Sequence, residues 1–198
     1  MSDVYDVVKV PNAVLKETSS VIESITEDIQ TQAKRMINTM HAAAGIGLAA
    51  NQVGLLNRMF VMDLPEGLWQ HGPEKNGVLT IEAGYRSGEK EENLIQQPRV
   101  FINPEVIWES EQRSVYDEGC LSLPNQYGEV IRPAQVRVKF QDENGNTHED
   151  LFDGLDSHCV QHEIDHLNGV LFIDYLSNLK RNMILKKMKK LHKDAGVL

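Results

Sequence analysis

Residues 161–169 read Gln-His-Glu-Ile-Asp-His-Leu-Asn-Gly, and this spacing predicts a helix that carries a metal site. At about 100° per residue, His162 and His166 lie about 40° apart on one face, so both imidazoles can bind one ion. Glu163 lies about 100° from His162, where it can act as the base for a water that the metal activates. The alternative is a polar helix face whose histidines make ordinary hydrogen bonds.

A catalytic metal site needs a third protein ligand and one open position. Two common arrangements are excluded by the sequence. One peptidase pattern needs a histidine at position 172, which is Phe172, and another uses a downstream glutamate, but no glutamate follows Glu163. The third ligand must therefore come from another residue type or another part of the chain.

The two cysteines compete for this role. Cys120 lies beside a glycine in Glu-Gly-Cys-Leu-Ser-Leu-Pro at residues 118–124. Cys159 is three residues before His162 on the same helix, about 300° round, where binding the same ion is geometrically difficult. We therefore favour Cys120 and expect Cys159 to be a small buried core residue. A disulfide between the two is the other alternative, which a reducing compartment disfavours.

The remaining histidines have weaker assignments. His158 lies one turn before His162 and could be a spare ligand, a proton carrier or, as we favour, the wall of a pocket. Asp165 is roughly 100° from the histidine face, which favours a structural pair with an arginine. The histidines without a partner at ligand spacing are expected to be solvated or structural: His41, His71, His148 and His192.

Hydrophobic periodicity predicts the other elements. An amphipathic helix is expected over residues 25–44, the metal-site helix from Asp156 or Ser157 to Leu167, and a basic helix over 177–193. Short strands are expected at residues 58–63, 100–108, 114–117, 128–132, 136–141 and 147–152. The middle of the chain is therefore mostly antiparallel sheet.

Length and composition indicate one folded domain. The chain has 198 residues, of which 41% are hydrophobic and 25% charged. Residues 64–98 are predicted to be a surface insertion with one weak strand candidate at 77–83. The longest apolar stretch, residues 42–50, is far shorter than a membrane span, and the N-terminus lacks the apolar region of a signal peptide. We therefore expect a cytoplasmic protein with no membrane contact.

Charge is distributed unevenly along the chain. The net charge is −9, but the segment from Ser177 to the C-terminus has seven basic residues and one acid, a charge of +6 that leaves −15 for the rest. An acidic body with a basic terminal segment indicates a partner that contacts only that segment.

Three separated segments together resemble the peptide deformylase family. They are Gly-Ile-Gly-Leu-Ala-Ala-Asn-Gln at 45–52, the stretch at 118–124, and the metal-site helix at 161–169. The resemblance covers most of the chain except residues 64–98. It implies an α+β fold in which antiparallel strands pack around a central metal-bearing helix, with an N-terminal and a C-terminal helix.

The resemblance also implies an activity and a ligand set. The metal ligands would be Cys120, His162 and His166, and the ion Fe²⁺, with Ni²⁺, Co²⁺ or Zn²⁺ as substitutes. The reaction would be removal of the formyl group from the N-terminal formyl-methionine of nascent proteins. Glu163 would move the proton, while the Gln52 amide and the Leu121 backbone N–H would stabilise the oxyanion.

Substrate contacts follow from the same resemblance. Residues that would border the peptide and its methionine side chain are Gly45, Ile46, Gly47, Leu121 and His158. His158 stands where the family has an apolar residue, and Tyr127 where some members carry arginine. Both departures concern the preference for peptides and leave the ligand set intact.

The partners and alternatives complete these expectations. The basic helix is expected to bind the ribosome, as in some bacterial members, and we favour a monomer. One alternative is a zincin-like metallopeptidase that uses the same motif. Another is a catalytically silent structural metal-binding protein, which would retain its metal without turnover.

Overall fold

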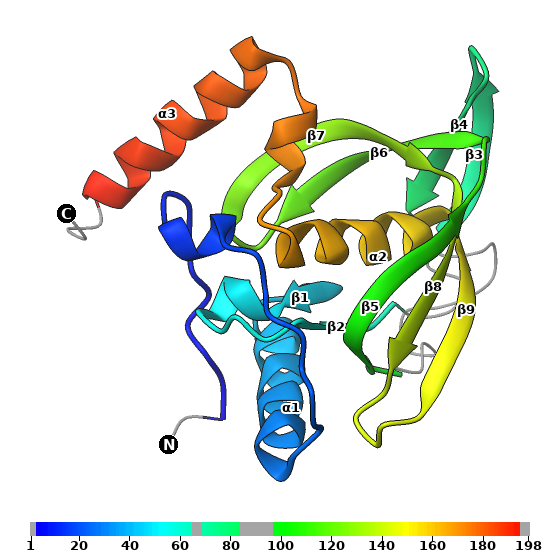
Figure 1. Ribbon diagram of the computed structural model, residues 1–198. Helices are drawn as coiled ribbons and strands as arrows, with labels where there is room; N and C mark the ends of the chain where they lie inside the picture. Colours follow the sequence, from blue (N-terminus) through cyan, green and yellow to red (C-terminus); the bar gives the residue numbers. More distant parts are fainter. Residues whose placement is uncertain (1–2, 65–68, 84–96, 195–198) are drawn as a thin grey trace.

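The computed structural model describes residues 3–64, 69–83 and 97–194. In these residues two β-sheets and three α-helices form a mixed α+β fold (Figure 1). This confirms the α+β class. Within the same ranges, no helix combines the length and the apolar composition that crossing a membrane requires.

The helices lie close to their predicted positions. They are α1 at Glu27–Ala42, α2 at Gly154–Leu167 and α3 at Asn178–Asp194. Thr26 begins α1, because its side chain accepts a hydrogen bond from the Ile29 N–H. The predicted start of α2 was wrong: Asp153 caps the Gly154 N–H, so the helix begins before Asp156.

The first sheet is antiparallel throughout and has the order β1-β2-β5-β8-β9. Its strands are β1 at Gly47–Ala49, β2 at Met59–Met62, β5 at Arg99–Glu109, β8 at Gln135–Gln141 and β9 at Thr147–Asp153. The second sheet has the order β3-β4-β6-β7. Its strands are β3 at Trp69–Lys75, β4 at Val78–Ala83, β6 at Arg113–Cys120 and β7 at Leu123–Pro133. The short 3₁₀ helices are η1 at Ala13–Lys16, η2 at Ala50–Val53 and η4 at Phe172–Tyr175.

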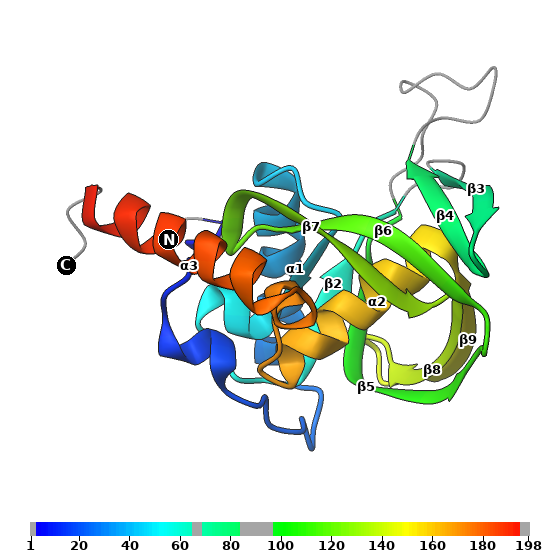
Figure 2. The ribbon, with the colours of Figure 1, turned by 90° about the horizontal axis from the view of Figure 1, so that it is seen from above.

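The described part of the 64–98 segment differs from expectation in two ways. It forms a hairpin of β3 and β4 rather than a single strand, and β4 pairs with β6 in parallel, an exception to the predicted antiparallel arrangement. Asn76 and Gly77 both have positive φ, as a tight hairpin turn requires. The ring of Trp69 packs over Gly154 at the start of α2, and its Nε1–H donates to Asp156 at 2.8 Å. The β3–β4 hairpin thus packs against the N-terminal end of α2 (Figure 2).

Helix α2 contacts strands of both sheets (Figure 1). Its apolar side packs with β2, β5, β8 and β9 in one core cluster, which includes Val160 and Ile164. A second cluster lies between α1 and the strands β1, β2 and β5, and a third joins the N-terminal segment, β7, η4 and α3. The polar side of α2 is buried against β1 and β6, where Gly47 adjoins Glu163 and Ser114 adjoins His158.

Helix α3 is attached to the body through few apolar side chains. Ile184 and Met188 are buried, whereas Leu179 is 74% and Met183 64% exposed. The described lysines on this helix from residue 186 onward are exposed. These lysine side chains are therefore open to solvent.

Candidate metal centre

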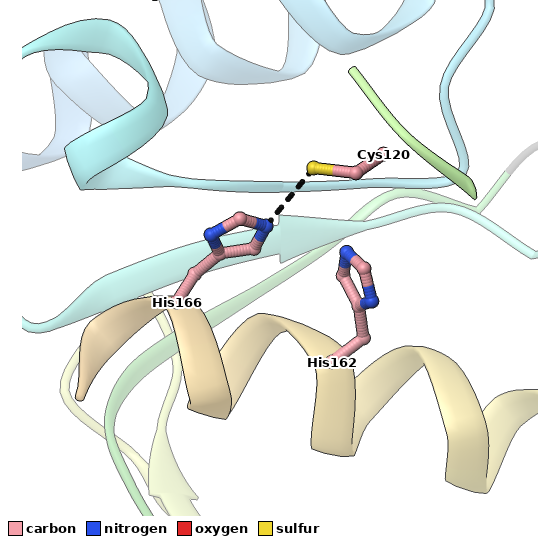
Figure 3. A group of neighbouring side chains, drawn as sticks. All are labelled: Cys120, His162 and His166. Atoms are coloured by element: carbon pink, nitrogen blue, oxygen red, sulfur yellow. Dashed lines mark hydrogen bonds between the residues drawn. The ribbon is translucent and has the colours of Figure 1, made fainter. Parts of the chain in front are cut away.

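The three residues proposed as ligands converge from two elements. Cys120 ends β6, while His162 and His166 lie one turn apart on α2 (Figure 3). One potential ligand atom from each residue lies within 4.8 Å of the other two. Cys120 Sγ is 3.2 Å from His166 Nε2. Spacing within the helix could not locate Cys120, because this residue lies on β6 and meets α2 only in the folded chain.

The ring of His162 is oriented by Glu118. His162 Nδ1 donates to Glu118 Oε2 at 2.9 Å, which leaves Nε2 for the centre. Burial opposes the protonated form of His162, but its interactions with the nearby Cys120 and Glu118 outweigh it and raise its pKa above the usual value.

Glu118 is itself held in a buried ion pair with Arg132, which sequence reasoning did not single out. Arg132 Nε and Nη2 donate to the two oxygens of Glu118, and Arg132 Nη1 donates to Asp165 at 2.8 Å. Burial would raise the pKa of Glu118, but hydrogen bonds from His158 and His162 and the charge of Arg132 hold it well below its usual range. The predicted pairing of Asp165 with an arginine is confirmed. The only available signal for Glu118 was its place two residues before Cys120.

Gln52, on η2, also borders the centre. Its Oε1 accepts the Ala49 N–H at 2.8 Å, which fixes the amide so that Nε2 lies 3.4 Å from Cys120 Sγ. Gln52 Nε2 is also 3.3 Å from Ser122 Oγ. Leu121, which follows Cys120, is tied through its carbonyl to the Nζ of Lys9 at 2.7 Å. The side-chain amide and the 120–122 segment therefore border the same space.

Glu163 is buried beside the histidines without being needed as a ligand. Its exposed fraction is 4%, and burial, only partly offset by the charge of His162, raises its pKa to about 7. Its Oε2 has no hydrogen-bond partner among the described residues. A carboxylate with a pKa near neutrality and a free oxygen is suited to accept and return a proton.

The donor set fits a divalent transition metal. Burial, followed by the charge of His162, lowers the pKa of His166 well below its usual value, so this ring is neutral and can offer a lone pair. One cysteine thiolate sulfur and two imidazole nitrogens are a common ligand set for such ions, and three protein ligands leave a position for water or substrate. Glu163, the residue after His162, has a buried oxygen, Oε2, that is unpartnered in the described part of the chain.

A cavity of about 580 Å³ opens over this group. Residues that line it include Gly45, Ile46, Gly47, Leu121, His158 and Tyr127. The cavity thus brings together the residues that the resemblance assigns to substrate. Tyr127 is 59% exposed and packs against Gly119, where a Cβ atom would lie 2.8 Å from the ring.

The remaining cysteine and histidines are placed outside the ligand group. Cys120 and Cys159 are free thiols, which rules against the disulfide alternative, and Cys159 is 6% exposed in the core, as expected. His158 is buried, with both ring nitrogens in hydrogen bonds. Carboxylates partner three other histidines: Asp63 binds His41, Asp153 binds His71 and Asp142 binds His148.

Fold and site together define a class: an α+β protein in which a helix with two histidines and a glutamate meets a cysteine is typical of mononuclear metal-dependent hydrolases. Residues 4–182 match the family described as polypeptide deformylase. The chain belongs to the polypeptide deformylase family.

Individual relatives agree with this assignment. The chain is 45% identical to the peptide deformylase of Novosphingobium aromaticivorans over 97% of its own length and 99% of the relative's. It is 47% identical to that of Bradyrhizobium diazoefficiens, with 96% and 97% covered. Its fold is similar to the crystal structure of peptide deformylase from Ehrlichia chaffeensis, with a TM-score of 0.80, 34% identity, and 97% and 98% covered.

Proposed function

We propose that this chain removes the formyl group from the N-terminal formyl-methionine of newly synthesised proteins, in a metal-dependent hydrolysis. The observation that carries the proposal is the approach of Cys120, from β6, to His162 and His166, from α2, within 4.8 Å, in a chain of the deformylase family. We further propose that residues 1–198 form one cytoplasmic catalytic domain, with an insertion at about 64–98.

Cys120, His162 and His166 would hold one divalent ion, and we favour Fe²⁺ over Zn²⁺, Ni²⁺ or Co²⁺ because of the family resemblance. Such an ion supplies Lewis acidity, which makes water a nucleophile at neutral pH and polarises the formyl carbonyl. The low pKa of Glu118 supports this assignment, since an ionised carboxylate keeps the His162 Nδ1 proton in place and directs Nε2 to the ion.

Glu163 is assigned as the proton carrier. It would accept a proton from the attacking water and return it to the amine that leaves. Its burial supports the role, because a pKa of about 7 lets the carboxyl group both take and give a proton near neutrality.

Gln52 and Leu121 are assigned to the oxyanion. Because the Ala49 N–H holds Gln52 Oε1, the amide presents its Nε2 donors to the space beside Cys120. The backbone N–H of Leu121 would be the second donor. Preformed donors of this kind stabilise the charge that develops on the formyl oxygen without reorganisation.

The cavity is assigned to the peptide. Gly45, Ile46 and Gly47 would lie along the peptide backbone, while Leu121 and His158 would border the methionine side chain. A cavity of about 580 Å³ has room for a methionine side chain and part of the following peptide.

The basic helix α3 is proposed to bind the ribosome. Its described lysines beyond residue 186 are exposed, and the body is acidic, so the helix would present positive charge to ribosomal RNA. We favour a monomer, which would leave this face free.

Formate release tests the proposed function. The iron-loaded protein, kept anaerobic, is incubated with a formyl-Met peptide and with its acetyl-Met counterpart. We expect formate from the first and no reaction of the second. Cleavage of internal peptide bonds would instead indicate a metallopeptidase, and metal retention without turnover would indicate a silent metal-binding protein.

A further inference from the structure

Each carboxylate oxygen of Glu118 accepts one guanidinium N–H and one imidazole N–H. Oε1 accepts from Arg132 Nε at 2.6 Å and from His158 Nδ1 at 3.0 Å. Oε2 accepts from Arg132 Nη2 at 3.0 Å and from His162 Nδ1 at 2.9 Å. Glu118, Arg132 and His158 are each less than 5% exposed. His158 is thus the counterpart of His162 across one buried carboxylate.

The far side of the His158 ring is fixed as well. Ser114 Oγ, on a fully buried residue, lies 3.0 Å from His158 Nε2. Because an ionised carboxylate only accepts hydrogen bonds, His158 Nδ1 carries a proton, and in the neutral ring Nε2 accepts the Ser114 hydroxyl. A residue that only formed the wall of a substrate pocket would need neither of these hydrogen bonds. The two hydrogen bonds therefore fix the His158 ring as a donor to Glu118.

We infer that His158 is a positioning residue that acts through Glu118 to fix the ring of His162 with Nε2 toward Cys120 and His166. The inference rests on the proposed function, since it assigns His158 a role in holding the metal of that site. This role is compatible with the proposed contact between His158 and the methionine side chain. One face of the His158 ring can line the cavity while both ring nitrogens are hydrogen-bonded to Glu118 and Ser114.

Loss of His158 would leave Glu118 with three donors and the Ser114 hydroxyl buried without a partner. Glu118 could then shift toward Arg132, and the ring of His162 would be less well held. Loss of such an outer partner typically weakens metal binding by about 10–100-fold. An asparagine at 158 can place its Nδ2 donor near the position of the histidine Nδ1 and so should keep the contact with Glu118.

The test is the Co²⁺ affinity of the full chain, measured by competition with a chelator and followed in the cobalt absorption spectrum. The variants are His158→Leu, His158→Asn and Ser114→Ala. Val160→Ala is the matched control, since Val160 is buried on the same helix but belongs to the apolar cluster on its other side. Thermal unfolding of each variant reports its stability.

We expect His158→Leu to weaken Co²⁺ binding by about 10–100-fold and to change the spectrum, and His158→Asn to restore most of both. Ser114→Ala should cause a smaller loss and remains informative if the leucine variant does not fold. Val160→Ala should lower the melting temperature and bind Co²⁺ like the wild type. Wild-type affinity in both His158→Leu and Ser114→Ala, or equal weakening by leucine and asparagine, would overturn the inference. A wild type that binds no metal would instead count against the proposed function.

Discussion

A Cβ atom on Gly47 would lie 2.4 Å from Glu163 Oε1 and 3.0 Å from Cys159 Sγ. The backbone of β1 therefore passes directly against the carboxylate that we assign as the proton carrier. Only a residue without a side chain lets the strand and α2 approach this closely. Gly47 thus allows β1 to lie against the Glu163 carboxylate.

Gly47→Ala is expected to displace the Glu163 carboxylate and lower kcat/KM for a formyl-Met peptide by about 10²-fold or more, because a displacement of about 1 Å at a reacting group has that cost. Metal content should be unchanged. Gly128→Ala is the comparison, since its Cβ would meet only the Leu176 side chain, at 2.7 Å, and that side chain can move. Equal losses in Gly47→Ala and Gly128→Ala would count against the special position of Gly47.

Glu163→Gln should retain the metal, because Glu163 is not one of the proposed ligands, and should lose about 10²–10⁴ in kcat, because an amide cannot accept the proton. Metal analysis and formate release on the same sample measure both. Near-normal turnover with bound metal would remove Glu163 from this role.

The sequence predicted those parts of the fold whose signals are local. The 3.6-residue pattern of α1 and the histidine spacing of α2 depend on one segment each, and both helices were placed within a few residues. The β3 strand was missed even though Asn76-Gly77, a strong hairpin signal, lies between β3 and β4. The surrounding charged and glycine-rich residues concealed it.

Long-range polar contacts could not be predicted in the same way. Arg132 lies on β7, 14 residues after Glu118 and 33 before Asp165, and neither spacing nor composition links it to His162. Likewise, the two hydrogen bonds of the His158 ring arise because β6 packs on α2. The sequence motifs predicted the residues at the centre. The groups that orient them, Glu118, Arg132 and His158, are brought together only by tertiary packing.

Cys159→Ser should lower stability more than turnover. The thiol is 6% exposed and makes a hydrogen bond to the Ile46 carbonyl, 3.7 Å away. A hydroxyl buried there costs about 1–3 kcal/mol in the free energy of unfolding. Thermal unfolding and formate release measured side by side test this. A large fall in turnover at an unchanged melting temperature would show that Cys159 contributes to the reaction.

Removing charge from α3 should separate ribosome binding from catalysis. Deleting residues 185–198 would also remove Met188, which is 2% exposed in a core cluster, so neutralising lysines is the cleaner change. The combined Lys186→Ala, Lys187→Ala, Lys189→Ala and Lys190→Ala variant should deformylate a short peptide normally but bind ribosomes more weakly. Wild-type binding should also fall steeply as salt rises. Equal, salt-insensitive sedimentation of both proteins with ribosomes would show that the basic face is merely solvated.

The most direct test of the central claim is the identity of the metal ligands, measured by X-ray absorption at the metal edge of the active, metal-loaded protein. We predict one sulfur and two imidazole nitrogens from the protein, with the sulfur signal lost in Cys120→Ser and one imidazole lost in His166→Ala. A metal environment without sulfur, or a sulfur signal that persists in Cys120→Ser, would contradict the centre formed by Cys120, His162 and His166.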